Sequence, residues 1–515
     1  MLRFKASPGW NAIPLATTRA VLLGDVVTMN NAREVILHGR LCLEGKNIVA
    51  VLRPGDPLPT GFCDVQQINV GGTIYPGLFD LHNHLPYNMI PLWQVGGTFT
   101  NRKQWQALPD YYPAVRAPFG LLNNHQDLDY RRAIIRFTEC RNLLGGVTTG
   151  HGMGLTKQVT YAGLMRNIEE PSDGGLPKVK SRTADMRLKD IADMVEWTSQ
   201  GRPYIYHLAE GVDQAARDCL FDLQQVAGAL NRKLVCIHAV GLQAEDFALM
   251  TNTAGIVWSP TSNLLLYGQT CRIADAKRFG VPIAIGADWS PSGCKNLLGE
   301  LKVARATSTH FGGVLSDKEL VEAVTCVPAK MIGWDAQLGS IEPGKRADLL
   351  VLAGSGQDPY TQLIEARESN VRALLIDGRL RLGQSDLTFG EPMSSEKLSV
   401  GGKTYVFDLA EPDGDGIGGM TLVDALAKID DGLRRLPELE AEQKTLLRSG
   451  ILQSTGWQLE DEMHDVNIET LLLEGSQHPA IAMRLAPLTA VDDPDFAKQM
   501  HASVNLPDYV KEVFR

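Results

Sequence analysis

The sequence predicts an α/β protein built on a TIM-type (β/α)₈ barrel, and two observations carry this prediction. Apolar strand-like runs alternate with helix-like stretches at about 30 residues per unit, which is the pattern of parallel β/α units covered on both faces. The alternating region spans residues 76–336. A stretch of about 250 residues organised in this way is most often a closed barrel.

The alternation is clearest in the second half of that region. Short runs rich in Val, Ile and aromatic residues are expected to be strands, at residues 203–209, 234–239, 255–260 and 281–288. The stretches between and after them are expected to be helices, at residues 213–229, 243–251, 271–279 and 296–309.

Strand-like sequence flanks the barrel region on both sides. Residues 18–75 contain four short apolar runs separated by Gly, Asn and Pro, and residues 337–384 return to the same character. We expect these two segments to be the two parts of one small β-sandwich. Residues 385–515 form an additional C-terminal module to which the sequence assigns no chemistry.

Composition restricts the class of partner. The formal net charge of −10 argues against a nucleic-acid backbone as the main partner. No run of about 20 apolar residues is present, and the first 20 residues lack the apolar stretch of an export signal. The eight cysteines include no C-x-x-C pair, so buried free thiols are expected. We therefore predict a cytoplasmic protein with a small-molecule partner and no membrane contact.

The strongest chemical signal is the sequence His82-Asn83-His84 after an apolar run. Side chains alternate between the two faces of a strand, so His82 and His84 point the same way and Asn83 points the opposite way. Two imidazoles at the C-terminal end of a barrel strand can hold one divalent metal. An H-x-H pair alone is weak support, because two histidines can also cap a strand.

Three more polar residues come where other expected strands end. His207, His238 and Asp288 each follow an apolar run, and Glu210 lies three residues after His207. Catalytic residues of (β/α)₈ barrels come from these strand ends. Several imidazoles and carboxylates meeting there are costly to bury without a partner, and a metal ion supplies one.

The order H-x-H, H-x-x-E, H and D, followed by the segment 338–350 (LGSIEPGKRADLL), resembles the amidohydrolase superfamily. Within it, the sequence is similar to the branch of cytosine deaminase, guanine deaminase and the triazine hydrolases. The resemblance covers roughly residues 20–382. It implies a homo-oligomer, most simply a dimer.

The resemblance also implies roles for individual residues. The implied metal ligands are His82, His84, His207 and Asp288. Glu210 is implied as the proton shuttle, and His238 as a catalytic group beside the attacking water. Asp288 is implied to act in catalysis as well as in metal binding. The implied substrate-binding residues are Ser262, Asn263 and Trp289, although Ser262 and Asn263 could instead cap a helix.

This ligand set suits one divalent ion, Zn²⁺ in the first place and Fe²⁺ as the alternative. Such an ion lowers the pKa of water toward neutrality. Asp288 can accept a proton from that water, His238 can stabilise the developing tetrahedral centre, and Glu210 can protonate the leaving nitrogen. An amine needs such an acid because an amide anion leaves poorly.

Two further residues leave alternatives open. In some branches of the superfamily a carboxylated lysine bridges two metals, and Lys180 lies in the corresponding region. His151 could enter the pocket from the second strand, or it could be a structural histidine.

Residues 85–125 interrupt the barrel after its first strand and are rich in aromatic residues. Such a segment can be a lid over a flat substrate, a subunit interface, or a small core of its own. The sequence does not separate these alternatives.

The sequence thus predicts a metal-dependent hydrolase that acts on a C–N bond, other than a peptide bond, of a cyclic amide or amidine or an aminated heterocycle. One alternative is a two-metal amidase or peptidase-like relative. Another is a non-catalytic binding protein on the same fold.

Overall fold

The structure is a computed structural model that describes residues 19–152, 163–171, 175–387, 395–410, 417–449 and 479–515. The N-terminal residues 1–18, on which the expectation about an export signal partly rests, lie outside the described residues. The described chain is an α/β protein with three sheets, as the sequence predicts.

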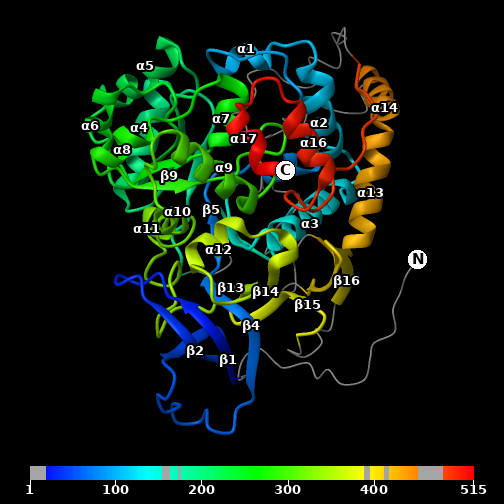
Figure 1. Cartoon of the computed structure of the whole chain (residues 1–515). Coiled ribbons are helices and arrows are strands. Elements are labelled where there is room, and N and C mark those ends of the chain that lie inside the picture. Colours follow the sequence, from blue (N-terminus) through cyan, green and yellow to red (C-terminus); the bar gives the residue numbers. More distant parts are fainter. Residues whose placement is uncertain (1–18, 153–162, 172–174, 388–394, 411–416, 450–478) are drawn as a thin grey trace.

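One sheet has nine strands and combines both flanking segments. Its strand order is β16-β17-β15-β14-β13-β4-β1-β2-β3. The strands are β1 (Arg19–Val27), β2 (Val35–Glu44), β3 (Asn47–Leu52), β4 (Gln67–Pro76), β13 (Leu349–Ala353), β14 (Val371–Ile376), β15 (Arg379–Gln384), β16 (Ser395–Val400) and β17 (Lys403–Asp408). Strands β4 and β13 join the N-terminal and C-terminal parts in antiparallel register, with Ile74 opposite Val351. In Figure 1 these strands lie below the helical part of the molecule.

Two parallel sheets carry the region between these flanks. The first has the order β12-β11-β10-β9-β8 and the second the order β5-β6-β7. Their strands are β5 (Leu78–Asp80), β6 (Val147–Gly150), β7 (Arg166–Asn167), β8 (Lys180–Arg182), β9 (Tyr204–Leu208), β10 (Leu234–His238), β11 (Gly255–Trp258) and β12 (Ile283–Ile285).

Backbone hydrogen bonds join the two parallel sheets at both pairs of edges. After β12, the amide of Asp288 donates to the carbonyl of His82, which follows β5 (2.8 Å). At the other edge, the amide of Val179 before β8 donates to the carbonyl of Ile168 after β7 (3.0 Å). These two hydrogen bonds connect the outer strands of one parallel sheet with the outer strands of the other.

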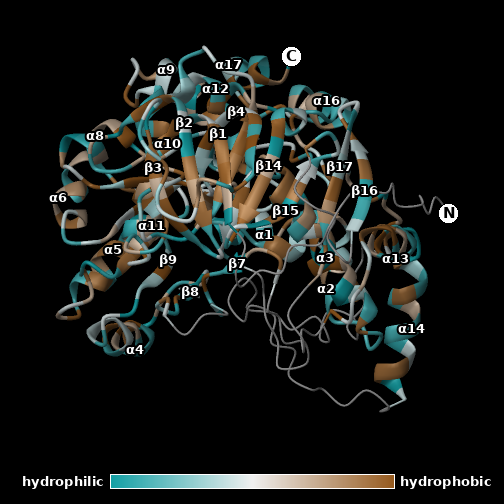
Figure 2. Ribbon diagram, turned by 90° about the horizontal axis from the view of Figure 1, so that it is seen from below, coloured by the Kyte–Doolittle hydropathy of each residue, from teal (hydrophilic) through white to brown (hydrophobic). Residues whose placement is uncertain are grey.

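Helices lie between the parallel strands and after the last of them. They are α3 (Asp129–Leu144), α4 (Leu188–Ser199), α5 (Gln214–Gln224), η3 (Ala244–Asp246), α6 (Phe247–Met250), α7 (Pro260–Tyr267), α8 (Ile273–Arg278), α9 (Leu297–His310), α10 (Asp317–Glu322) and α11 (Cys326–Met331). Figure 2 shows hydrophobic residues concentrated in strands of the sheet such as β1 and β14. None of the helices in the described part of the chain has the length and apolarity that a membrane crossing requires.

The expected strands of the second half are present, each with ends that differ by a few residues from the expectation. The expected helix at 243–251 is divided into η3 and α6. Helix α7 was not expected as a helix. It begins with Pro260, whose fixed φ suits the first helical position.

The segment after β5 forms short helices, and the C-terminal extension packs beside them. The segment contains η1 (Leu85–Met89), α1 (Arg102–Gln106), η2 (Tyr112–Arg116) and α2 (Ala117–Asn123). Two short helices, α12 (Pro359–Glu365) and η4 (Glu368–Asn370), precede the C-terminal extension. The helices of the extension are α13 (Leu422–Arg434), α14 (Leu436–Arg448), α16 (Pro494–Ala502), α17 (Asp508–Lys511) and η5 (Glu512–Phe514). Helix α13 contacts α3, α14 contacts α2, and α17 contacts α9 (Figure 1).

Candidate metal centre and active site

The polar residues singled out from the sequence meet at the C-terminal ends of the parallel strands. His82 follows β5, His207 lies in β9, His238 ends β10 and Asp288 follows β12. All four side chains are buried. The strands therefore bring together residues that are more than 200 positions apart in the sequence.

Four side chains turn one atom each toward a common point. The Nε2 atom of His207 lies 3.1 Å from Nε2 of His82 and 3.2 Å from Nε2 of His84. The Oδ1 atom of Asp288 lies 3.2 Å from Nε2 of His82 and 3.7 Å from Nε2 of His84. These four residues are the metal ligands that the sequence resemblance implies.

The other ring nitrogens of two of these histidines have fixed partners. His82 Nδ1 lies 2.6 Å from the hydroxyl oxygen of Ser259, and His207 Nδ1 lies 3.2 Å from the carbonyl oxygen of Arg182. A carbonyl can only accept, so His207 carries its proton on Nδ1 when neutral and presents a lone pair on Nε2. Partners of this kind orient metal-binding histidines.

Burial and mutual repulsion keep the imidazoles of His82 and His207 uncharged. Burial lowers the pKa of His82 and His207 well below the ordinary value, and the neighbouring imidazoles lower it further. Burial raises the pKa of Asp288. Several lone pairs and a buried carboxylate facing one another are stabilised by a cation.

The donor set fits a single divalent ion. Ligand nitrogens at about 2.0–2.1 Å from a tetrahedral zinc lie roughly 3.3–3.4 Å from one another. The four donor-atom separations given above, 3.1–3.7 Å, are close to this spacing. Two overlapping triads have ligand atoms within 4.8 Å of one another: His82 with His84 and Asp288, and His82 with His207 and His238. Geometry alone thus also admits His238 as a ligand.

His238 has a separate set of contacts that suits a catalytic group. Its Nδ1 lies 2.9 Å from the amide nitrogen of Asn263, and its Nε2 lies 3.7 Å from Oε2 of Glu210. With Asn263 donating to Nδ1, neutral His238 carries its proton on Nε2. That N–H faces the same space as Glu210 and the ligand atoms.

The backbone is strained where these residues leave their strands. His238 has φ of 68° and Asp288 has φ of 57°, and Ala209, between His207 and Glu210, has φ of 51°. Residues other than glycine rarely adopt this left-handed conformation, and it occurs preferentially at functional sites.

Asp80 is a buried residue of the site that the sequence reasoning missed. It accepts hydrogen bonds from Asn83 Nδ2 (2.8 Å), the amide of Ala287 (3.2 Å) and the amide of His82 (3.3 Å). Burial raises the pKa of Asp80 to about 7. It connects the end of β5 with the end of β12 and so holds the first and last ligand segments together. The sequence offered one signal for Asp80, because this carboxylate lies only two residues before His82.

The three predicted substrate-binding residues occupy different positions. Trp289 lines the cavity beside the cluster. Ser262 and Asn263 lie in α7 and are not among the residues that line this cavity. Ser262 Oγ is 2.7 Å from Ser292 Oγ, and Asn263 contacts His238. Neither is the N-cap of α7, which is Ser259.

The sequence left open the roles of two further residues, Lys180 and His151. Neither supplies one of the four converging ligand atoms. Lys180 is exposed, and its Nζ lies 4.2 Å from the centre of the Trp197 ring. His151 is buried, and its Nε2 lies 3.6 Å from Oε1 of Glu169. The ring of His151 also lies 6.4 Å from the ring of His84, so both interpretations of His151 stay predictions.

The segment 85–125 forms a small aromatic core that also covers the cluster. Tyr87 stacks on Phe119 at 3.9 Å, and Trp105 lies 5.6 Å from Trp289. The cavity at the cluster measures only about 20 Å³ and is lined by residues of this segment as well as of the strand ends. That volume holds about one water molecule. Three of its lining residues, Arg102, Trp105 and Gln106, belong to α1, so α1 covers this cavity.

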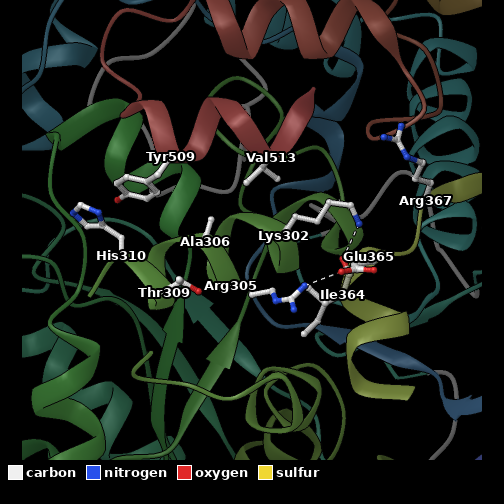
Figure 3. Close-up of a pocket in the computed structure, with 10 residues that line it drawn as sticks. All are labelled: Lys302, Arg305, Ala306, Thr309, His310, Ile364, Glu365, Arg367, Tyr509 and Val513. Carbon is white, nitrogen blue, oxygen red and sulfur yellow. Dashed lines mark hydrogen bonds and ion pairs between the residues drawn. The ribbon is translucent and has the colours of Figure 1, made fainter. Parts of the chain in front are cut away.

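A larger cavity, of about 470 Å³, shares no lining residue with the one at the cluster and lies between α9, α12 and the C-terminal helices (Figure 3). Its cationic side chains already have partners. Lys302 donates to the carbonyl of Ile364 (2.7 Å), and Arg305 pairs with Glu365 at 3.1 Å. We therefore place the candidate active site at the smaller cavity, where the ligand atoms are.

Sequence comparison supports the family that these motifs resemble. Residues 187–381 match the family model described as the amidohydrolase family. The matched range contains His207, Glu210, His238 and Asp288 and does not reach His82 or His84. The match confirms the resemblance stated from the motifs.

Individual relatives are deaminases. The chain is 31% identical over 180 residues to the 5-methylthioadenosine/S-adenosylhomocysteine deaminase of Teredinibacter turnerae, covering 32% of this chain and 41% of the relative. It is 23% identical over 333 residues to guanine deaminase of Escherichia coli, covering 55% of this chain and 73% of the relative. The chain thus spans less than half the length of the first of these relatives.

The fold is similar to that of solved members of this group. A zinc-bound adenosine deaminase from Xanthomonas campestris has a TM-score of 0.57 and 20% sequence identity. The likeness covers 72% of this chain and 94% of that protein. At this identity, the comparison shows the shared fold.

Proposed function

We propose that the protein is a metal-dependent hydrolase that acts on a C–N bond, other than a peptide bond, of an aminated heterocycle or a small cyclic amide or amidine. The observation that carries the proposal is the convergence of His82, His84, His207 and Asp288 on one point, with Glu210 and His238 beside it. The deaminase relatives support an amine as the leaving group.

We further propose that the eight parallel strands close into one (β/α)₈ barrel. The backbone hydrogen bonds from Asp288 to His82 and from Val179 to Ile168 support closure at both edges. We also propose that the nine-stranded sheet folds over on itself to form the small β-sandwich, because Val26 and Leu41 from its N-terminal part share a buried cluster with Val351 and Leu375 from its C-terminal part.

When bound, a zinc or iron ion held by His82, His84, His207 and Asp288 supplies a Lewis acid that lowers the pKa of water and polarises the substrate. The Asp288 carboxylate accepts the proton of the attacking water. The Nε2–H of His238 donates to charge that develops at the carbon under attack.

Glu210, which is protonated before this step, donates its proton to the leaving nitrogen and is reprotonated after the proton on Asp288 returns to solvent. Its carboxylate lines the cavity together with His238, and its side chain is only 8% exposed. Protonation of the departing nitrogen releases ammonia or an amine instead of an amide anion. The α1 segment excludes bulk water from this step.

The alternatives have less support from the structure. A two-metal site bridged by Lys180 needs that side chain at the cluster, and its Nζ packs on Trp197 instead. A non-catalytic binding protein does not require Glu210 and His238 beside an intact ligand set. The dimer and the cytoplasmic location stay predictions from the sequence.

The test is metal content followed by ammonia release. We expect about one zinc or iron per chain in protein purified without chelator, and loss of that metal in His82→Ala. His125→Ala is the matched control. The His125 ring accepts a hydrogen bond from the amide of Asp127 and is not part of the cluster. The metal-loaded protein is then screened for ammonia release from aminated purines, pyrimidines and triazines, with Glu210→Gln as the inactive reference.

Two outcomes would contradict the proposal. Absence of metal even after reconstitution rejects the hydrolase and leaves a binding protein. Metal binding without turnover of any C–N substrate in the panel rejects the proposed substrate class.

A further inference from the structure

The carboxylate of Glu210 is held from two sides by residues distant in sequence. The Tyr267 hydroxyl donates to Oε1 at 2.7 Å, and Arg102 Nη1 lies 3.4 Å from Oε2. Tyr267 is the last residue of α7 and Arg102 is the first residue of α1. All three side chains are buried or nearly so.

Trp105 fixes the direction of this chain of hydrogen bonds. Its Nε1–H donates to the Tyr267 oxygen at 3.0 Å. An indole N–H can only donate, so the tyrosine oxygen accepts here and its own proton goes to Glu210. Burial raises the pKa of Tyr267 well above its usual value, which keeps it a donor.

The C-terminal extension ties together the two elements that carry these residues. The side-chain amide of Asn505 donates to the carbonyl of Gly97 at 2.8 Å and to the carbonyl of Leu265 at 3.0 Å. Gly97 lies five residues before Arg102, and Leu265 two residues before Tyr267. Figure 1 shows the red C-terminal segment beside α7 and close to α1.

The approach to α1 has a second contact with the same extension. The side chain of Gln94 donates to the carbonyl of Gln499 at 3.2 Å. The amide of Phe99 also donates to the carbonyl of Leu266 at 2.8 Å, next to Tyr267. The chain that leads into α1 is therefore fixed against both α7 and residues 494–505.

We propose that Tyr267 and Arg102 are positioning residues for Glu210, and that Asn505 of the C-terminal extension fixes the segments that carry them. The inference rests on the proposed function in that Glu210 is the acid–base group. It also assigns a role to the C-terminal extension, which lies beyond the part of the chain that matches the family.

The physical consequence concerns orientation of the carboxylate. Two hydrogen-bonding partners at different oxygens restrict its rotation and keep Oε2 near His238. Without the Tyr267 hydroxyl, Arg102 is the stronger remaining partner and draws the carboxylate toward α1 and away from His238. A displacement of about 1 Å in a reacting group can cost about 100-fold in rate.

The variants are Tyr267→Phe and Asn505→Ala, each with a matched control. Tyr75→Phe removes another buried tyrosine hydroxyl, one that donates to Gln362 at 2.9 Å in the nine-stranded sheet. Asn231→Ala removes another asparagine that donates to a backbone carbonyl, that of Gly228 at 2.8 Å. The controls report the cost of losing such a contact anywhere in the molecule.

Two measurements do not depend on turnover. Carbodiimide labelling in the presence of an amine, read by mass spectrometry, reports access to the Glu210 carboxylate, with the 71% exposed Glu245 as internal reference. Hydrogen exchange reports opening of residues 94–107. We expect faster labelling of Glu210 in both variants and faster exchange in Asn505→Ala, with both controls and the metal content unchanged.

Turnover then separates positioning from folding. With any substrate found in the ammonia screen, we expect kcat of Tyr267→Phe to fall about 10- to 100-fold with little change in KM. Equal labelling and equal kcat in Tyr267→Phe and Tyr75→Phe would overturn the inference. Increased labelling in a protein that never releases ammonia would instead uphold the positioning contacts and reject the proposed function.

Discussion

The Nδ1 atom of His82 lies 2.6 Å from the hydroxyl oxygen of Ser259, and this contact turns the other ring nitrogen toward His207 and Asp288. Ser259 comes directly after β11 and precedes α7. A residue outside the ligand set thus determines how a ligand from the opposite sheet is oriented. His82 is fully buried, so water does not replace this partner.

We therefore predict that Ser259→Ala weakens metal binding by about 10- to 100-fold, the usual effect of removing a partner of a metal-bound histidine. Competition with a chromophoric chelator measures the affinity. Ser308→Ala is the control, because Ser308 is a buried serine that bonds to the backbone of Leu315 instead. Equal affinities in the two variants would show that Ser259 does not orient His82.

Lys180→Ala is predicted to leave the amount of bound metal unchanged. The Lys180 Nζ lies over the ring of Trp197 and is exposed, so the side chain does not supply a bridging ligand. Elemental analysis of wild type and variant checks this expectation. A fall from two ions per chain to fewer would restore the two-metal alternative.

The ligand positions could be predicted from the sequence because they follow from local rules. Strand alternation places His82 and His84 on one face, and the ends of apolar runs identify His207, His238 and Asp288. Their convergence then follows from the parallel arrangement of the strands.

The partners of Glu210 could not be predicted in the same way. Tyr267 lies in a helix that the sequence did not indicate, and Arg102 lies in an insertion whose path no periodicity determines. The sequence also did not indicate to which face of its strand Lys180 points. Strand β8 has only three residues, which are too few to show an alternation of apolar and polar side chains. Contacts between irregular segments depend on tertiary packing, which local patterns do not encode.

Glu300 provides a test of pH dependence. This fully buried glutamate accepts a hydrogen bond from the amide of Thr261 at 2.9 Å, and burial raises its pKa from 4.5 to about 8. The folded protein therefore keeps a proton that the unfolded chain loses above about pH 4.5. The resulting stabilisation is present at low pH and is lost as the pH rises toward 8.

We predict that Glu300→Gln becomes more stable relative to the wild type as the pH rises from 5 to 8. Each unit of pKa difference corresponds to about 1.4 kcal/mol, so the relative gain is a few kcal/mol. Urea unfolding of both proteins at pH 5, 6.5 and 8 measures it. The exposed Glu442, replaced in the same way, serves as the control. A difference that does not vary with pH would mean that Glu300 is ionised in the folded protein.

Glu368 anchors the C-terminal extension to the rest of the fold. Its buried carboxylate accepts hydrogen bonds from Asn296 Nδ2 (2.7 Å) and from the amides of Ala490 (2.7 Å), Val491 (3.0 Å) and Asp492 (2.9 Å). Asn296 is the N-cap of α9, so one side chain connects the start of that helix with residues 490–492.

Glu368→Gln is predicted to loosen residues 486–515 and to lower the free energy of unfolding by about 2–4 kcal/mol. The new amide places a donor against backbone N–H groups, which leaves buried donors without an acceptor. Limited proteolysis should then cut the extension earlier than in the wild type. The control Glu365→Gln alters a 59% exposed carboxylate three residues away, whose surface pair with Arg305 contributes at most about 1 kcal/mol. Equal proteolysis of both variants would contradict the anchoring role, whereas a selective effect at Glu368 would show that its contacts with residues 490–492 anchor the extension.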